Sequence, residues 1–310
     1  MRIIWTMTWK ELLRKRVLLL TLLLTVVFLL GFWFIAGAIA GDSTSRVITG
    51  GTNNETMIQE FTLGMFILML GFFFASFVLA FLAIFSSFST IAGEAEQGVM
   101  QAMLPRPIPR WKWYTGRWLG YVSLGVIYAL VLYSLILWIT DVHASIPRDP
   151  VVLVQSFLLF ASVVPLLVTV SMFGSGYLSS VANGVVMTML YGAGWLGGMV
   201  GKIIGSVGLE SGPMQTLNNI TGVLSLIMPA DGLQRKMQAV LFSFENINGL
   251  IPVSTSGPFG IGEIPSTAFL IYAHFTRLCS LDSGCAALSA RIYRFYFEVS
   301  DFSSHSKKLF

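Results

Sequence analysis

The sequence predicts an all-α polytopic membrane protein, and two observations lead to this fold class. First, 55% of the 310 residues are hydrophobic and only 11% are charged, whereas a soluble domain carries roughly a quarter charged residues. Second, four stretches of 25, 33, 23 and 52 residues contain no Asp, Glu, Lys, Arg or His. Because a spanning helix needs about 20 apolar residues, the first three stretches fit one span each and the last fits two. The composition excludes an ordinary soluble enzyme.

The first predicted element is an N-terminal interfacial helix over residues 1–16. Trp5, Trp9 and Leu12 fall at i, i+4 and i+7 on one face, while Lys10 projects from the opposite face. Tryptophan rings and long basic side chains suit the headgroup layer of a membrane. The alternative interpretation is a basic, aromatic flank of the first span without a further role, and the two interpretations are compatible.

The transmembrane domain follows over residues 17–273. Its spans are predicted at about 17–40, 61–88, 118–140, 151–173 and 184–205, and a sixth, truncated or disrupted span begins at 264–273. The uncharged stretches predict that the five confident spans hold no ionisable residue. Intramembrane ionisable residues mark proton relays and ion pathways, so we expect neither an ion-coupled transporter nor an intramembrane protease.

The basic residues predict the orientation. They gather before the first span and between the second and third spans, whereas only Arg46 and Arg148 occupy the short loops on the other side. By the positive-inside rule, the N-terminus and the second loop are cytoplasmic. The net charge of +4 thus follows a membrane pattern, and no nucleic-acid partner is expected. The first apolar stretch is longer than the roughly 7–15 residues of a signal-peptide core, which favours a retained helix.

The fifth span contains a glycine pattern that predicts close helix packing, because small residues let backbones approach each other in lipid. The glycines are Gly194, Gly197, Gly198, Gly201 and Gly205. The pattern leaves open whether the neighbour belongs to this chain or to a partner. Beyond this span, helical apolar spacing predicts two short amphipathic extracytoplasmic helices, over 214–227 and 233–244, at the outer membrane surface. We interpret Asp231 as an N-cap with Gln234 as its capping-box partner.

The cytoplasmic loop after the second span is the most informative segment. Glu94 and Glu96 are predicted to open a helix over 93–105, since acidic groups are favourable at a helix N-terminus. Its apolar positions are Val99, Met100, Met103 and Leu104. Three prolines then stop it, because proline lacks an N–H and restrains the preceding residue. A short, exposed amphipathic helix of this kind is suited to receive force from a soluble partner; the alternative is a solvated connector that only sets topology.

Motifs of ATP-dependent and metal enzymes are missing from the sequence. Gly201-Lys202 is followed by Ile203 and is not a P-loop. Cys279 and Cys285 form neither a CxxC nor a Cys/His cluster. We therefore expect no catalytic residue, cofactor or metal site in this chain.

The loop pattern G-E-x-E-x-G, followed by paired hydrophobic residues and R-P-I-x-R, resembles the membrane subunits of type-two ABC exporters. The resemblance runs from residue 1 to about 273 and implies that the 93–105 segment is a coupling helix that docks on a separate ATPase. The implied ATPase-coupling residues are Glu94, Glu96, Gly98, Met100, Leu104, Arg106, Pro107 and Arg110. The family usually has Thr or Ser after the motif glycine, whereas this chain has Val99.

The resemblance implies a permease subunit of an ABC exporter in the cytoplasmic membrane of a bacterium or archaeon. Its partners are two ATP-binding-cassette ATPase subunits and a second permease subunit, identical or related, with which it lines the translocation path. The 214–245 helices act as an outer lid. The uncharged spans favour an apolar or amphipathic substrate; the alternative is a small cation, because backbone carbonyls can also line a path. The alternative is a stand-alone multi-pass membrane protein, such as an immunity factor or an assembly scaffold, without an ATPase partner.

The last 37 residues depart from this pattern. After Ala273 the predicted sixth span is interrupted by polar and charged residues, among them His274, Arg277 and Asp282. Our hypothesis is that residues 274–310 are out of frame, because an apolar helix changes composition abruptly there; the alternative is a genuine divergent tail. Translating the other two frames of the gene beyond codon 273 decides between them.

Overall fold

The structure is a computed structural model in which the backbone is described for most of the chain. The described residues are 2–47, 53–98, 109–144, 149–207, 219–220, 222–223, 226, 228–242 and 265–306. The burial of side chains is described for these residues except 42–47, 53–61, 203–207, 267 and 289–306. Within the described residues every regular element is a helix.

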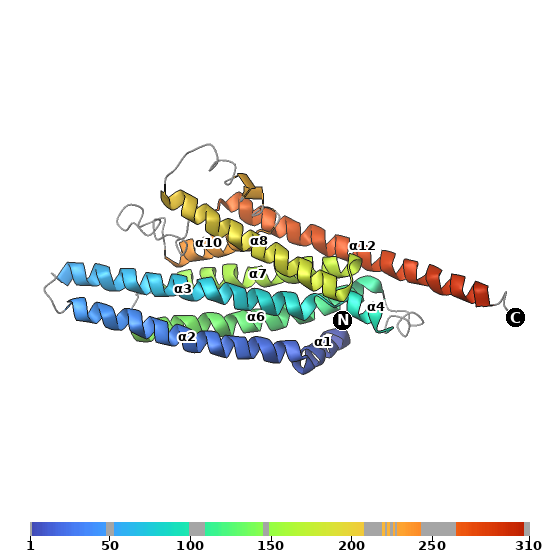
Figure 1. Ribbon diagram of the computed structural model, residues 1–310, viewed down its shortest axis with the longest axis horizontal. Helices are drawn as coiled ribbons and strands as arrows, with labels where there is room; N and C mark the ends of the chain where they lie inside the picture. The colour runs from blue at the N-terminus through green and yellow to red at the C-terminus, as the bar shows by residue number, and fades with distance from the viewer. Residues whose placement is uncertain are drawn as a thin grey trace.

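Five helices in the described part of the chain are long and apolar enough to cross a membrane, which confirms the predicted fold class. They are α2 (Arg16–Val47), α3 (Asn53–Ser87), α6 (Arg110–His143), α7 (Pro150–Tyr177) and α8 (Ser180–Val207). Four shorter or less apolar helices are α1 (Arg2–Arg14), α4 (Ala92–Glu96), α10 (Ala230–Leu241) and α12 (Thr267–Ser306). The long helices lie side by side in a bundle, with α2 along one edge (Figure 1).

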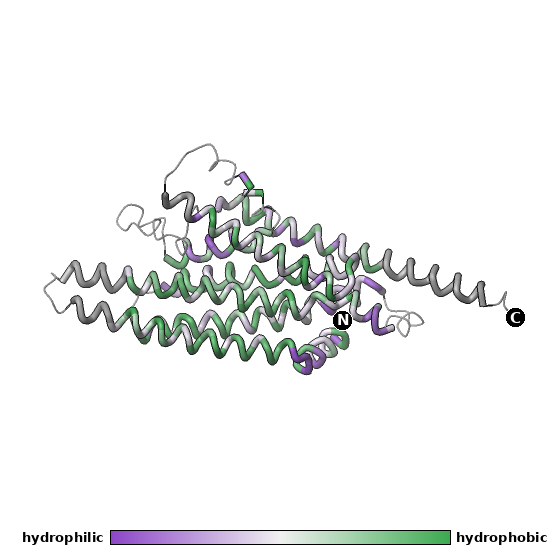
Figure 2. The backbone as a smooth tube through the Cα atoms, in the orientation of Figure 1, coloured by the Kyte–Doolittle hydropathy of each residue, from purple (hydrophilic) through white to green (hydrophobic). Residues whose placement is uncertain are grey.

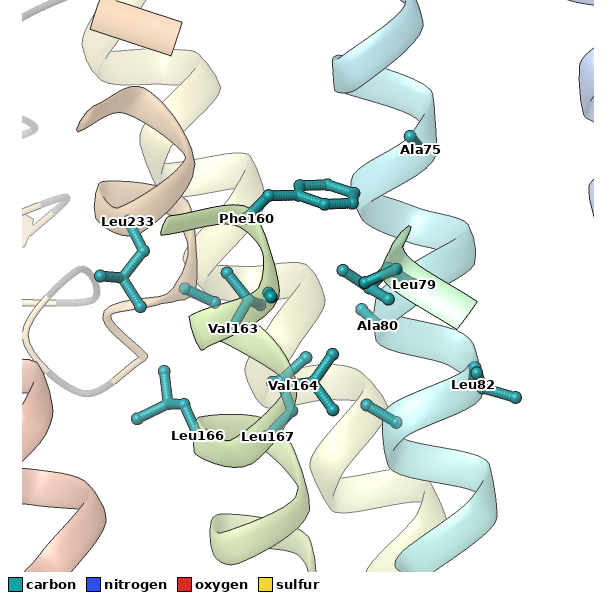
Figure 3. Close-up of a cluster of buried hydrophobic side chains, with 14 of the residues drawn as sticks. Ala75, Leu79, Ala80, Leu82, Phe160, Val163, Val164, Leu166, Leu167 and Leu233 are labelled. Carbon is teal, nitrogen blue, oxygen red and sulfur yellow. The ribbon is translucent and has the colours of Figure 1, made fainter. Parts of the chain in front are cut away.

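Helix α7 is the centre of the bundle. It contacts α3, α6, α8, α10 and α12, and it is apolar on every face, which is typical of a helix that spans a membrane or lies in a core. Its buried side chains Phe160, Val164 and Leu167 meet those of α3, including Leu79, while Leu233 of α10 closes the other side (Figure 3). The N-terminus of α7 is fixed by Asp149, whose Oδ1 accepts a hydrogen bond from Val151 N at 3.2 Å.

Helix α1 lies across one end of α6. Gly120 of α6 lacks a side chain where Thr8 of α1 packs, so the two backbones approach closely. The indole N–H groups of Trp5 and Trp9 both donate to Ser123 Oγ, at 3.0 and 2.8 Å. The predicted tryptophan face of the N-terminal helix is therefore attached to a spanning helix of the same chain.

The hydrophilic residues gather at the ends of the bundle. Figure 2 shows them at the α1–α2 junction and beside α4, at one end, while the middle of the long helices is hydrophobic. The predicted orientation makes this the cytoplasmic end. The start of α6 and the α7–α8 connection lie at the same end (Figure 1), so four segments of the chain meet there.

Helix α10 corrects the prediction of an amphipathic helix lying on the outer membrane surface. Eight of its twelve residues are buried, and it packs against α7 and α8. A Cβ at Gly232 would overlap the ring of Phe269 in α12, so α10 is also covered from that side. Its polar residues Asp231, Gln234 and Gln238 are buried inside the protein. Of the other predicted outer helix, most residues lie outside the described part of the chain.

Helix α12 is continuous through residue 273. It packs on α7, where Ala287 contacts Gly176, and its C-terminal end extends beyond the other helices (Figure 1). Within it, His274 Nε2 and Arg277 Nη2 lie 2.8 Å apart on an exposed face. Helical continuity does not distinguish a genuine tail from an out-of-frame one, so that hypothesis stays a prediction.

Candidate functional site

Glu94 and Glu96 lie on α4, which follows α3 directly. Contrary to the prediction, they do not open a helix that runs on to residue 105, because α4 ends at Glu96. Gly98 has a φ of +70°, a left-handed conformation that glycine adopts at helix ends without steric cost. Gln97 N and Gly98 N bond back to the carbonyls of Gly93 and Ala95 at 3.0 and 3.2 Å. The two glutamates therefore form a separate acidic turn ahead of the predicted amphipathic segment.

Arg117 of α6 joins this turn to α1. Its Nη2 donates to Glu94 Oε1 and its Nη1 donates to Glu11 Oε2. The side chains of Arg117 and Glu94 are 14% and 12% exposed, and that of Glu11 is 40% exposed. The guanidinium also lies over the Trp113 ring, 5.5 Å from its centroid. One largely buried cation thus links α4, α6 and α1.

Glu11 remains charged in this arrangement. Partial burial raises its pKa, but Arg117 and the nearby ammonium of Lys15, whose Nζ is 3.0 Å from Glu11 Oε1, together hold the pKa below its ordinary value. Two carboxylates and two cations therefore alternate across α4, α6 and α1, with charges that balance.

Glu96 caps the N-terminus of α8. Its Oε1 accepts a hydrogen bond from Ser180 N at 2.9 Å, and its Oε2 accepts one from Ser180 Oγ at 2.7 Å. The first N–H groups of a helix have no partner within the helix, and the helix dipole favours a negative charge there. The second glutamate of the motif therefore attaches the acidic turn to a different spanning helix from the first.

Uncharged hydrogen bonds complete the attachment. Ser175 Oγ of α7 accepts from both Ile91 N and Ala92 N at 3.0 Å. Asn183 Nδ2 of α8 donates to Phe88 O at 2.7 Å and to Ser171 O of α7 at 2.9 Å. We define residues 88–98 as the acidic linker. It is bound to α1 through Arg117, and directly to α6, α7 and α8.

Replacing Asn183 with alanine should destabilise the protein by about 2 kcal/mol, because two hydrogen bonds are lost and two carbonyls lose a buried partner. Thermal unfolding of the purified protein in detergent measures the effect. Thr188→Ala is the matched control, since the Thr188 hydroxyl bonds only to Gly184 O of its own helix. Equal melting temperatures for the two variants would show that Asn183 does not hold the linker.

A second polar cluster lies at the other end of α8. Asp231 Oδ2 and Arg235 Nε of α10 are 2.9 Å apart, with side chains 7% and 15% exposed. Lys202 of α8 is 8% exposed and interacts electrostatically with both. We call these three residues the outer charge cluster. It carries two positive charges and one negative charge, and charges in such a buried place are costly unless paired.

Two predictions are wrong at this cluster. Asp231 is not an N-cap: Pro229 occupies that position, and the Asp231 side chain makes no capping bond. The fifth span is not free of ionisable residues, because Lys202 belongs to its apolar helical stretch, Ser180–Lys202. The charge-free stretch ends at Gly201, but the predicted span runs to 205 and includes Lys202. The carboxylate of Asp231 lies close to this ammonium, which lets the helix keep it inside the protein.

Two glycines of the α8 pattern let α8 pack closely against α10 and the residue just before it. A Cβ at Gly198 would overlap the Asp231 carboxylate, and a Cβ at Gly194 would lie 3.1 Å from that of Met228. Both neighbours belong to this chain and lie on or just before α10, rather than on another long spanning helix. Gly197 is buried as well, Gly201 is half-buried, and Gly205 lies in the part of α8 whose burial is not described.

The remaining predicted coupling residues are placed as follows. Arg110 is the first residue of α6. Met100, Leu104, Arg106 and Pro107 lie outside the described residues, so their predicted role is not tested. Among the described residues, no group of three or more His, Cys, Asp or Glu side chains is arranged to hold a metal ion. Sequence analysis missed Arg117, Ser175, Ser180 and Asn183, which contact the acidic linker, and Glu11, which binds Arg117.

Comparison with known proteins gives one family match. The model of a family described as "ABC-2 family transporter protein" matches residues 4–273. The match covers most of the chain, and it ends at the residue after which the composition changes. No curated protein matches the chain significantly.

Proposed function

Because the chain belongs to the ABC-2 transporter family, we propose that it is the permease subunit of an ABC exporter, driven by separate ATPase subunits. Two permease chains, identical or related, line the path, and two ATPases bind on the cytoplasmic side. The N-terminus, α1 and the acidic linker face the cytoplasm, as the distribution of basic residues favours.

The observation that carries this proposal is the attachment of the acidic linker. A segment that transmits force from a partner must be fixed to the helices it moves. Glu94 binds Arg117 of α6, and Glu96 binds the first residue of α8. A displacement of the linker therefore acts on several spanning helices together, whereas a solvated connector needs none of these contacts.

The proposal divides the coupling residues into two groups. Glu94 and Glu96 direct their carboxylates toward this chain's own helices, so we assign them to transmission. The apolar residues Met100 and Leu104, with the Arg106-Pro107 pair that follows, are assigned to docking on the ATPase. The division predicts that the two groups give different phenotypes when changed.

Purification of the tagged full-length chain from its host membranes in mild detergent tests the proposal. The wild-type chain should retain a P-loop ATPase, detectable by mass spectrometry. Leu104→Asp should lower its recovery about tenfold or more, since a charge in an apolar interface costs more than about 1.4 kcal/mol.

Gln101→Asp is the matched control, because it adds the same charge to the same segment, off the predicted apolar face. It should leave recovery unchanged. If no P-loop ATPase accompanies the wild-type chain, the proposal is wrong and a stand-alone membrane protein is favoured. If both variants lose the ATPase equally, the apolar face is not the docking surface.

A further inference from the structure

An apolar groove of about 380 Å³ lies between α2 and α6. Leu82 of α3 contributes to it from behind, and Trp9 and Leu13 of α1 lie at its cytoplasmic end. Its volume is within the range of roughly 300–1,000 Å³ that small-molecule sites occupy. It is separate from the acidic linker and from the outer charge cluster.

The groove has a buried floor and an exposed rim. Thr21, Leu82 and Leu132 are at most 2% exposed, whereas Leu22 and Ile127 are 47% and 51% exposed. It therefore opens sideways, from between two spanning helices toward the surrounding bilayer.

The few polar groups that line the groove bond to the protein itself. Thr21 Oγ1 donates to Leu18 O at 2.9 Å, Thr25 Oγ1 donates to Thr21 O at 2.6 Å, and the hydroxyls of Thr25 and Tyr128 share a hydrogen bond. No polar group is left to attract a polar occupant, so a hydrocarbon occupant fits.

The length of the groove corresponds to one leaflet. On α2 it extends from Leu18 to Leu29, and on α6 from Leu124 to Leu135. Each range covers twelve residues and therefore eleven steps along the helix, which is about 17 Å at ~1.5 Å per residue. Half of the hydrocarbon core of a bilayer is roughly 15 Å thick. A hydrocarbon chain that enters the groove at the α1–α2 junction thus reaches about the middle of the membrane.

The cytoplasmic mouth of the groove is cationic. Arg14 and Arg16 flank the α1–α2 junction, next to the groove residue Leu13, and both are exposed, as is Lys10. The nearby carboxylate of Glu11 is already paired with Arg117 and Lys15. The mouth therefore has a net positive charge at the depth of the lipid phosphates.

We propose that this groove binds an anionic phospholipid of the cytoplasmic leaflet, with one acyl chain between α2 and α6 and the phosphate against Arg14 and Arg16. The cationic mouth and the leaflet-length apolar groove together select this ligand over a zwitterionic lipid. The bound lipid fills the space between two helices that have little direct contact, and it connects α1 to both. This site does not depend on the proposed transport function.

Native mass spectrometry of the delipidated, purified chain tests the site. Phosphatidylglycerol should bind about tenfold or more tightly than phosphatidylcholine with the same acyl chains, because each basic residue near the surface attracts anionic lipid. Arg14→Gln with Arg16→Gln should remove this preference but keep binding of both lipids. Lys112→Gln, which removes an exposed cation at the same end of the bundle, should leave the preference unchanged.

Substitutions that fill the groove with a large side chain distinguish specific lipid binding from general contact with lipid. Leu22→Trp and Ile127→Trp, from opposite walls, should each reduce bound lipid severalfold. Leu23→Trp and Leu130→Trp are matched controls on the same two helices, since both residues are exposed but do not line the groove. Size-exclusion chromatography confirms that each variant is folded.

Equal lipid binding by the filled variants and their controls would overturn the proposal. So would a tenfold preference that survives loss of both arginines. A dimer that dissociates in the filled variants without any change in bound lipid would assign the groove to a helix of a second copy and would likewise overturn it.

Discussion

Replacing Asp231 with alanine should prevent the stable folding of this protein, or lower its free energy of unfolding by about 3–5 kcal/mol. The Asp231 side chain is 7% exposed, and it is the negative member of a cluster that also contains Lys202 and Arg235. Its removal takes the negative charge away from Lys202 and Arg235, two like charges whose side chains are largely buried. Yield from the membrane and thermal unfolding in detergent measure the loss.

Two further variants show whether the loss of stability comes from the charges of the cluster and from the position of the Asp231 carboxylate. Adding Lys202→Met to Asp231→Ala removes one of the two cations that face Asp231 and should recover part of the stability. Gly198→Ala should destabilise the wild-type protein, because its Cβ displaces the Asp231 carboxylate, whereas Gly192→Ala on the same helix has nothing within 4 Å of the new Cβ. If Asp231→Ala melts at the wild-type temperature, the cluster does not hold α10 in the bundle.

The uncharged stretches were sufficient to predict the five spanning helices, because the bilayer imposes a length and an apolarity that a sequence displays directly. The helix ends were predicted less well. Helix α3 begins at Asn53, eight residues before the predicted span, since a helix continues into water wherever its residues permit. Composition locates the hydrocarbon core, whereas hydrogen bonding decides where a helix starts.

The contacts of the functional site could not be predicted in the same way. The motif indicated Glu94 and Glu96, but their partners, Arg117 and Ser180, lie 23 and 84 residues away. A charge at the start of a span has an obvious role in orientation, so nothing in the local pattern marks Arg117 as a buried link. The prediction for Asp231 is wrong for a related reason. Its spacing to Gln234 fits a capping box, and only the packing of α10 on Gly198 shows that its carboxylate faces inward.

Under the proposed function, replacing Arg117 with alanine should weaken the coupling between the ATPase and the spanning helices, while the ATPase stays bound. Arg117 is the shared partner of Glu94 in the acidic linker and Glu11 in α1. Its loss leaves the nearly buried Glu94 carboxylate unpaired, which destabilises the linker, while the partly exposed Glu11 can be solvated. We expect normal recovery of the ATPase in co-purification, but ATP turnover by the reconstituted complex about 2- to 30-fold lower, the range for losing about 0.5–2 kcal/mol of coupling.

The double variant Arg117→Ala with Glu94→Gln distinguishes transmission from stability. It removes the buried charge that Arg117→Ala leaves behind, so its melting temperature should recover, yet the contact between the linker and α6 remains broken and turnover should stay low. Lys112→Ala, an exposed cation on the same helix, should change neither property. Recovery of both melting temperature and turnover in the double variant would mean that the Glu94–Arg117 contact only stabilises the fold. Because the linker also binds α7 and α8, coupling would then have to pass through Ser175 and Ser180, and the same pair of measurements on Ser175→Ala and Ser180→Ala would locate it.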